Sequence, residues 1–458
     1  MGDDLTCFKA YDIRGRVGID LTEEIAARIA CAMAAELGAR RIVLARDVRP
    51  SSAPFAAAIA AALAESGVRV LYLGLAGTEE MYFATAHLAA DGGICVTASH
   101  NPAGDNGMKL VGAGAAPLSP GTFAAIRLRA GRRATPVRDD PPPAGGGITD
   151  ASDLRAAYVD HVLRFVDPAR LGPLHILVNC GNGAAGPTFD AVAGALAARG
   201  ARLRYTRMHH DPDGRFPNGV PNPLLPATHP ATAAALRAAG ADMGVAFDGD
   251  FDRCFFFDHE GRFVPGEIVV ALLADAFLAR EPGAAILHDP RSVLATRHAI
   301  ARAGGRAVMV PTGHAHLKRA MRDTGAVYGG EMSAHHYFRD FFCCDSGMIP
   351  WLLVADLICR SGQRLGALVS DLRDAFPSSG EINFRVPDTA AAIARIEAAY
   401  APQARTRDDS DGLSLDFGTW RLNLRASNTE PLLRLNVESR ARPDLVEQAV
   451  AEITALLA

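Results

Sequence analysis

A pattern of helix, small-residue turn, short apolar strand and polar loop recurs three times along this 458-residue chain. The three loops hold Ser99, then Asp248 to Asp252, then Glu331 to His335. Because strands alternate with helices, the pattern predicts sheets with helices packed on their faces. Sheets of this kind place their chemistry at the ends of strands. The chain is therefore predicted to be an α/β protein whose polar loops carry its function.

The expected helices and strands follow from apolar periodicity and capping residues. The first unit has expected strands at 41–45, 68–73 and 92–97, and helices at 22–37, 52–65 and 79–90. Later strands are expected at 175–179, 202–205 and 243–247, and then at 285–288, 307–310 and 326–328. After residue 371, strands at 381–386, 420–425 and 432–438 and helices at 389–400 and 443–457 indicate a smaller antiparallel α+β domain. The stretch 132–147, rich in Pro, Gly and Arg, is predicted to be a linker.

Composition excludes several classes of protein. At about 150 residues per domain, the length suggests roughly three domains. The net charge of −4 offers no basic surface for nucleic acid. We find no apolar run long enough for a membrane span and no signal peptide. The eight cysteines are scattered without a CxxC pair, which favours reduced thiols in a cytoplasmic protein.

Asp248, Asp250 and Asp252 place three carboxylates within five residues. Unpaired, they would repel one another and raise each other's pKa, whereas a hard cation such as Mg²⁺ removes the conflict. An EF-hand is excluded, because its sixth position would be Arg253 and its twelfth His259. The alternative is a solvated acidic turn, but apolar strands on both sides favour the metal site. Arg253 would then face phosphate oxygens.

Ser99 can act as a nucleophile or as a phosphate carrier. A simple turn serine is the alternative. A Ser-His-Asp hydrolase is also conceivable, but the chain lacks a G-x-S-x-G elbow here, and the adjacent His100 is not expected to reach the serine hydroxyl. Phosphoserine fits better, because a metal site and phosphate-seeking arginines are also present. His100, His314 and His335 lie in candidate loops, where a structural role is as well supported as a catalytic one.

Only three of the 47 Lys and Arg residues are lysine: Lys9, Lys109 and Lys318. A lysine retained in so arginine-rich a chain suggests a role for a compact ammonium. Lys109 follows the serine loop, so we expect it to act in acid/base catalysis or to contact phosphate, with a surface lysine as the alternative. A last polar loop reads either as a phosphate pocket or as a hairpin turn; its residues are Arg425, Ser427, Asn428, Thr429 and Arg434.

Five motifs, in order, resemble the α-D-phosphohexomutase superfamily over essentially the full chain. They are Tyr11-Asp-Ile-Arg14-Gly, Thr97-Ala-Ser-His-Asn-Pro102, Asp248-Gly-Asp-Phe-Asp-Arg253, Gly330-Glu-Met-Ser-Ala-His335 and Arg425-Ala-Ser-Asn-Thr-Glu-Pro431. The stretches 216–223, 248–258 and 330–351 are similar to the bacterial phosphomannomutase branch, which feeds GDP-mannose synthesis. The resemblance implies three tandem mixed α/β sandwich domains plus a C-terminal α+β domain around a central cleft. The implied domains are 1–145 with the phosphoserine loop, 150–253 with the metal loop, 254–372 with the sugar loop and 373–458 with the phosphate loop.

The same resemblance implies a reaction and a role for each residue. Ser99 would carry a phosphoryl group in the resting enzyme, beside one Mg²⁺ per chain held by Asp248, Asp250, Asp252 and the phosphoserine. Mannose 6-phosphate and mannose 1-phosphate would interconvert through a hexose 1,6-bisphosphate, which also activates the enzyme. The implied catalytic residues are Ser99, His100, Lys109, Arg14 and Arg253, with Arg14 and Lys109 as acid/base candidates. The implied substrate-binding residues are Glu331, Ser333, His335, His314, Arg291, Arg425, Ser427, Asn428, Thr429 and Arg434.

Three positions depart from the commoner family pattern. Arg291 stands where many relatives have Lys, and Phe251 and Ala334 stand where Gly is commoner. The last two match the phosphomannomutase branch. A phosphoglucomutase or dual-specificity enzyme remains the alternative, followed by a non-catalytic sugar-phosphate sensor and a phosphatase. We expect small hexose phosphates as partners, no nucleic acid or membrane, and a cytoplasmic monomer or weak homodimer.

Overall fold

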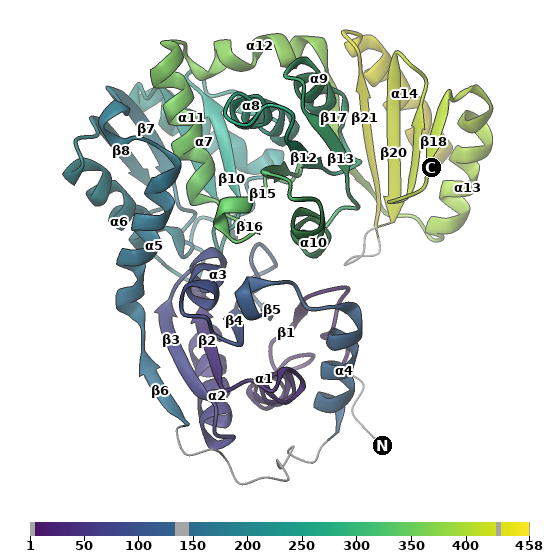
Figure 1. The fold of residues 1–458 in the computed structure, drawn as a ribbon. Coiled ribbons are helices and arrows are strands. Elements are labelled where there is room, and N and C mark those ends of the chain that lie inside the picture. The colour runs from purple at the N-terminus through teal and green to yellow at the C-terminus, as the bar shows by residue number, and fades with distance from the viewer. Residues whose placement is uncertain (1–4, 133–145, 427–431, 458) are drawn as a thin grey trace. The chain divides into compact units, whose positions relative to one another are not determined.

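The computed structural model describes residues 5–132, 146–426 and 432–457, so the predicted linker falls almost entirely outside the described residues. The contacts within the chain divide it into two units, whose helices and strands are labelled in Figure 1. Unit 1 is Met1–Phe263 with Asp340–Gly362, and unit 2 is Val264–Arg339 with Gln363–Ala458. In the part of the chain that the structure describes, no helix combines the length and apolar character that a membrane crossing needs.

The first sheet of unit 1 has the strand order β1-β5-β4-β2-β3-β6. Its strands are β1 (Ile13–Arg16), β2 (Arg41–Arg46), β3 (Arg69–Leu75), β4 (Gly92–Val96), β5 (Asp105–Gly112) and β6 (Gly147–Asp150). The helices are α1 (Glu23–Leu37), α2 (Ser52–Glu65), α3 (Thr78–His87) and α4 (Pro120–Gly131). Apolar residues of α1, α2 and α4 share one buried core with the strands. Helix α3 packs against β2 and β4 outside that core, and thereby brings its first turn to the ends of these strands.

The second sheet of unit 1 has the order β11-β10-β9-β7-β8. Its strands are β7 (Leu174–Asn179), β8 (Leu203–Met208), β9 (Met243–Phe247), β10 (Cys254–Asp258) and β11 (Phe263–Val264). The helices are α5 (Arg155–Val162), α6 (Ala185–Ala198) and α7 (His229–Ala239). The later segment of unit 1 contains α11 (Met348–Ser361) and the short strand β16 (Cys344–Asp345), which is not part of this sheet. Strand β9 is parallel to β7 and antiparallel to β10. The acidic loop therefore joins two neighbouring strands of one sheet.

Unit 2 contains two further sheets. The strands of the first include β12 (Ala285–His288), β13 (Arg306–Met309), β14 (Tyr328–Gly330) and β15 (His336–Phe338), with helices α8 (Gly266–Leu278), α9 (Leu294–Arg302), α10 (His314–Thr324) and α12 (Leu365–Ala375). The second is fully antiparallel, in the order β17-β21-β20-β19-β18. It comprises β17 (Ser378–Phe384), β18 (Thr406–Asp408), β19 (Leu413–Asp416), β20 (Trp420–Ala426) and β21 (Leu433–Ser439), with α13 (Thr389–Tyr400) and α14 (Pro443–Leu457). The predicted antiparallel α+β character of this last part is confirmed.

Two features of unit 1 differ from the sequence-based expectations. Strand β5, which carries Lys109, is absent from the expected strands; within it, Asn106 is fully buried and donates to the hydroxyl oxygens of Ser51 and Ser52. The second sheet also continues past the boundary predicted at residue 253, because Cys254 of β10 pairs with Phe247 of β9. The domain boundaries otherwise stay predictions, as does the central cleft.

Helix α3 buries two adjacent carboxyl groups, Glu79 and Glu80. Glu79 Oε1 accepts a hydrogen bond of 3.2 Å from the backbone N–H of Met348. Burial, reinforced by the charge of Glu80, raises the pKa of Glu79 well above its usual value. A carboxyl group with a raised folded-state pKa stays protonated in the fold after it has ionised in the unfolded chain. Stability is therefore lost as pH rises from about 4.3 toward the folded-state pKa.

Replacing Glu79 by Gln is expected to remove this loss of stability. We compare the melting temperatures of Glu79→Gln and the wild type at each pH. As the pH rises, the wild type loses stability and the variant does not, so the difference in favour of the variant should grow. Thermal unfolding at several pH values between about 4.3 and 8 measures the difference. The exposed Glu23 in the first turn of α1 provides the control variant, Glu23→Gln. If the difference in melting temperature does not change with pH, the claim that Glu79 stays protonated in the fold is wrong.

Candidate active site

Ser99 lies in the loop that follows β4 and is almost fully buried. Its backbone φ is 50°, in the left-handed region that non-glycine residues rarely adopt. The Thr97 hydroxyl oxygen holds this conformation by accepting from the Ser99 N–H at 2.8 Å. Strain of this kind persists only where the surroundings impose it, and it occurs preferentially at functional sites.

The acidic loop after β9 meets the serine loop directly. Ser99 Oγ donates a hydrogen bond of 2.6 Å to Asp248 Oδ2, although 149 residues separate the two in the chain. A Cβ placed on Gly249 would lie only 2.4 Å from the Ser99 carbonyl oxygen, so the approach of the two loops requires glycine there. The structure therefore brings the predicted serine and the predicted carboxylates into one site.

The three aspartates of this loop suit a divalent cation. Asp248, Asp250 and Asp252 are each at most 1% exposed, and each offers a carboxylate oxygen within 4.8 Å of the others. The Oδ1 atom of Asp250 is buried and has no hydrogen-bond partner among the described residues. A buried carboxylate oxygen without a donor is costly unless a cation or water binds it. The residues present therefore fit Mg²⁺, which prefers oxygen ligands.

Two cationic side chains flank the carboxylates. Lys109 Nζ lies 2.8 Å from Asp250 Oδ2 and also contacts Asp252 Oδ2. Burial lowers the pKa of Lys109, but the two carboxylates outweigh burial and hold it above its usual value. Lys109 is thus a charged donor in this arrangement, which suits phosphate binding better than proton abstraction. Arg253 Nη2 lies 2.8 Å from Asp248 Oδ2.

Two predicted residues lie against the serine. Arg14 Nη1 donates to the Thr97 carbonyl oxygen at 3.3 Å, which places this guanidinium beside the loop. His100 Nδ1 lies 3.2 Å from Ser99 Oγ, so the expectation that these adjacent side chains would not meet is wrong. The left-handed backbone at Ser99 turns the two side chains toward each other. Arg253 contacts the same nitrogen, and in the part of the chain that the structure describes no carboxylate is hydrogen-bonded to His100 as a hydrolase triad requires.

Sequence reasoning missed the arginine that holds the serine loop. Arg49 follows β2, and its side chain is 0% exposed. Its Nη1 donates to the carbonyl oxygens of Pro102 (2.7 Å) and Asp105 (2.9 Å), and its Nη2 to those of Ser99 (3.0 Å) and Asn101 (2.6 Å). One guanidinium therefore holds four carbonyl groups of the loop. The available signal was an Asp-x-Arg sequence at the end of the strand beside the serine strand.

In unit 2, several predicted residues lie close together, and Arg291 and Glu331 among them are buried. Arg291 Nη2 lies 3.4 Å from Glu331 Oε1 and 3.0 Å from Ser333 Oγ. Glu331 Oε1 also accepts from the N–H of Gly313 at 3.0 Å, directly before His314 at the start of α10. His335 joins the loop through its carbonyl oxygen, which accepts from the Glu331 N–H at 3.0 Å.

Glu381 of β17, which sequence reasoning missed, contacts three of the predicted arginines. Its carboxylate lies 3.5 Å from Arg291 Nη1, 3.3 Å from Arg425 Nη2 and 3.4 Å from Arg434 Nη1. Ser427, Asn428 and Thr429 lie outside the described residues. The predicted sugar and phosphate arginines of unit 2 thus converge on one carboxylate.

The left-handed backbone explains why glycine is commoner at two of the positions that depart from the family pattern. Phe251 has φ 47° and Ala334 has φ 66°, so both positions favour glycine. A Cβ placed on Gly77 would lie only 2.2 Å from the Phe251 ring, which shows how closely this ring packs against the start of α3.

Comparison with known proteins gives consistent matches over the whole chain. Models of the phosphoglucomutase/phosphomannomutase family match at residues 6–134 (alpha/beta/alpha domain I), 156–261 (domain II), 265–376 (domain III) and 381–456 (C-terminal domain). A phosphomannomutase of Salmonella montevideo is 54% identical over 457 residues, and a protein of Xanthomonas campestris pv. campestris named phosphohexose mutases is 51% identical over 454; each match covers 99% of both chains. A crystal structure of a phosphoglucomutase/phosphomannomutase family protein from Burkholderia thailandensis aligns with TM-score 0.85 and 29% identity, covering 99% of this chain and 97% of that one.

Proposed function

The chain belongs to the phosphoglucomutase/phosphomannomutase family, and from that premise we propose that it is a Mg²⁺-dependent phosphomannomutase. It is an isomerase with the four-domain α/β architecture of the family. Mannose 6-phosphate and mannose 1-phosphate interconvert through a hexose 1,6-bisphosphate. The observation that carries the proposal is the hydrogen bond between Ser99 Oγ and Asp248 Oδ2, because it joins the phosphoryl carrier to the carboxylate triplet.

The reaction consists of two phosphoryl transfers that mirror each other. In the first, a sugar hydroxyl oxygen bonds to the phosphorus on Ser99 while the bond between phosphorus and Oγ breaks. The sugar hydroxyl loses a proton and the serine oxygen gains one, so atoms and charge balance. The released Ser99 hydroxyl then donates to Asp248, as it does in this structure. In the second transfer, Ser99 Oγ bonds to the other phosphorus of the bisphosphate while the bond between that phosphorus and its own sugar oxygen breaks. Ser99 loses a proton and this second sugar oxygen gains one, so the step balances and the isomeric monophosphate is released.

The residues of unit 1 stabilise the charge that moves during transfer. Asp248, Asp250, Asp252 and the phosphoserine would hold Mg²⁺, which supplies charge neutralisation at the phosphoryl oxygens. Lys109 and Arg253 carry positive charge beside these carboxylates and can donate to phosphoryl oxygens. Phosphoryl transfer depends mainly on such positioning and electrostatic stabilisation. Arg14 and Lys109 stay the acid/base candidates, and the charged Lys109 is suited to donate a proton to the transferring oxygen rather than to remove one.

The clusters of unit 2 are suited to hold the rest of the substrate. Glu331 offers acceptors and Ser333 a hydroxyl for sugar hydroxyl groups, with Arg291 holding both in place. Arg425 and Arg434 present guanidinium groups for the phosphate that does not react, together with Ser427, Asn428 and Thr429. Turnover requires this phosphate site to accept either phosphate of the bisphosphate in turn.

Mannose phosphates are the favoured substrates, because relatives named phosphomannomutase match at 46–54% identity over the full chain. The glucose-specific alternative is not favoured. We further propose a cytoplasmic enzyme that supplies mannose 1-phosphate for GDP-mannose synthesis, active as a monomer or weak homodimer.

A comparison of two substrates tests the proposed function. We expect kcat/KM for mannose 1-phosphate to exceed that for glucose 1-phosphate by at least about tenfold, because enzymes that hydrogen-bond a sugar hydroxyl discriminate against its misplacement. A coupled assay with hexose 1,6-bisphosphate, run with Mg²⁺ and after chelation, measures both values. Chelation should abolish turnover. A glucose preference would overturn the substrate assignment, net phosphate release would indicate a phosphatase, and absent turnover with Ser99 phosphorylated would indicate a sensor.

A further inference from the structure

The first turn of α3 holds the acidic loop at Asp250. Thr78, the first residue of the helix, is fully buried and belongs to none of the motifs. Its backbone N–H donates to the Asp250 carbonyl oxygen at 3.2 Å, and its Oγ1 donates to Asp250 Oδ2 at 2.5 Å. Thr78 therefore holds both the backbone and the carboxylate of one predicted metal ligand.

The two oxygens of the Asp250 carboxylate have different surroundings. Oδ2 accepts from the Thr78 hydroxyl and from Lys109 Nζ, at 2.5 and 2.8 Å. Oδ1 is buried and has no hydrogen-bond partner among the residues that the structure describes. Because the fixed donors hold Oδ2, Oδ1 is the oxygen left for a cation. Partners that orient a ligating carboxylate in this way affect metal affinity nearly as strongly as the ligands themselves.

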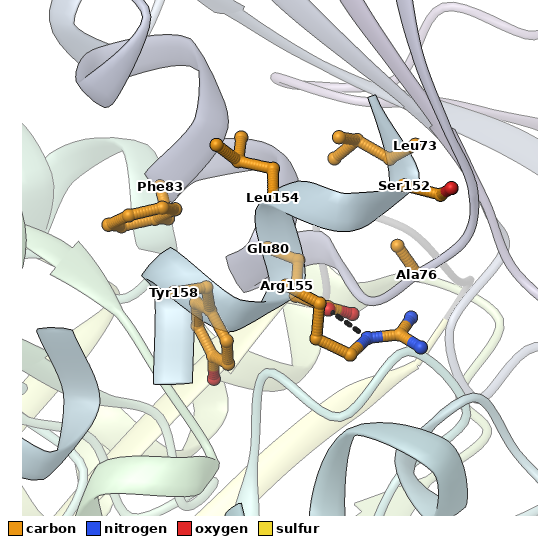
Figure 2. A pocket seen from close by; sticks show the side chains of 8 residues that line it. All are labelled: Leu73, Ala76, Glu80, Phe83, Ser152, Leu154, Arg155 and Tyr158. Carbon is orange, nitrogen blue, oxygen red and sulfur yellow. Dashed lines mark hydrogen bonds and ion pairs between the residues drawn. The ribbon is translucent and has the colours of Figure 1, made fainter. Parts of the chain in front are cut away.

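Helix α3 is itself held in place, so the Thr78 hydroxyl is in position before a cation binds. Glu80 Oε2 accepts from the Gly77 N–H at 3.0 Å and from Thr188 Oγ1 at 3.0 Å. Glu80 Oε1 pairs with Arg155 Nε at 2.7 Å, at the pocket beside the helix (Figure 2). These contacts tie the first turn of α3 to α5 and α6, so that the helix cannot turn without breaking buried polar contacts.

We propose that Thr78 is a positioning residue that sets the divalent-cation affinity of the site by orienting the carboxylate of Asp250. The inference rests on the proposed function only in requiring that the aspartate triplet binds a divalent cation. It assigns the effect to the hydroxyl group rather than to the volume of the side chain. Thr78→Val removes the hydroxyl and keeps the shape, and Thr78→Ser keeps the hydroxyl.

The chain offers a matched control on the same helix. Thr85 is also fully buried, and its Oγ1 donates to the Met81 carbonyl oxygen at 2.7 Å within α3. Thr85→Val therefore removes an equally buried hydroxyl that touches neither Asp250 nor the serine loop. A general loss of helix stability would affect this variant as much as Thr78→Val.

The test measures cation binding directly. Full-length wild type and the three variants are stripped with a chelator and titrated with Mn²⁺, following free Mn²⁺ by electron paramagnetic resonance, and with Mg²⁺ by calorimetry. We expect Thr78→Val to raise the Kd for both cations by about tenfold or more, and Thr78→Ser and Thr85→Val to stay within about twofold of the wild type. In the mutase assay, Thr78→Val should need more Mg²⁺ for half-maximal rate and recover most of kcat at saturating Mg²⁺.

Each other outcome overturns a defined claim. Unchanged cation affinity in Thr78→Val would overturn the inference, with the proposed function left standing. Equal weakening in Thr78→Ser would show that the hydroxyl is not responsible, and equal weakening in Thr85→Val would assign the effect to helix stability; both results overturn the inference. A wild type that binds neither cation would overturn the metal site of the proposed function and this inference together.

Discussion

Ser99→Ala should lower kcat by at least about four orders of magnitude, because no other atom can take Oγ's place in accepting the phosphoryl group. Ser99 Oγ lies 2.6 Å from Asp248 Oδ2, and the alanine variant lacks this oxygen. The coupled assay with mannose 1-phosphate and hexose 1,6-bisphosphate measures kcat. Intact-mass analysis should find phosphate on the wild type and none on the variant.

The control for this variant is Ser119→Ala. Ser119 Oγ accepts from the Thr122 N–H at the start of α4, away from the serine loop, and its loss should cost about 1 kcal/mol of stability without changing kcat. Near-normal turnover in Ser99→Ala would refute the phosphoserine mechanism. Phosphate found on the Ser99→Ala protein would place the carrier elsewhere.

Arg49→Met should both destabilise the protein and slow the reaction. The change leaves Asp47 and four loop carbonyl oxygens without their buried cation, at a cost of about 3–5 kcal/mol. The serine loop would then shift, and a displacement of about 1 Å can lower kcat about 100-fold. Thermal unfolding and the coupled assay measure the two effects separately.

Arg49→Lys separates positioning from folding. Lysine keeps the positive charge beside Asp47 but cannot reach four carbonyl oxygens from one planar group. We expect this variant to fold and to lose kcat, with little change in KM, because the loop moves while the clusters of unit 2 stay intact. Arg46→Lys is the control, since the Arg46 side chain donates to the Tyr72 hydroxyl oxygen and to the Asp47 carbonyl oxygen, and among the described residues it makes no hydrogen bond to the serine loop. Wild-type kcat in Arg49→Lys would contradict the positioning role.

Local patterns identified many elements of the fold accurately. The helix at 52–65 and the strands at 243–247 and 285–288 have their predicted ends, because apolar periodicity and neighbouring turn residues are local signals. Strand β5 was not predicted, and the apolar stretch that forms β10 was assigned to the next domain instead of the sheet of β9. The polar Asn106 near the start of β5 donates to serine hydroxyl oxygens at the start of α2, and β10 belongs to its sheet because it pairs with β9. The apolar stretch after the acidic loop indicated a strand, but its own sequence does not show which strand it pairs with.

The residues of the candidate site likewise fall into those that the sequence identified and those that it did not. The aspartate triplet, the serine loop and the arginines of the last domain carry their chemistry in short motifs, and these were found from residue type and spacing. Arg49, Thr78 and Glu381 were missed, because each acts by contacting backbone or side chains that are remote in the chain. The Asp-x-Arg sequence at the end of β2 was the one local signal, for Arg49, and it does not show which carbonyl groups the arginine contacts.

What the chain's own residues determined is which chemistry is available: a hydroxyl, three carboxylates and several guanidinium groups at the ends of apolar strands. Only the tertiary structure decided which atoms meet. It placed Ser99 Oγ within hydrogen-bond distance of Asp248 and brought Arg49 against the serine loop. It also gave one oxygen of Asp250 two donors and the other none among the residues described in the structure. The reason is physical, since periodicity and turn preference act over a few residues, whereas these contacts depend on the packing of whole sheets and helices against one another.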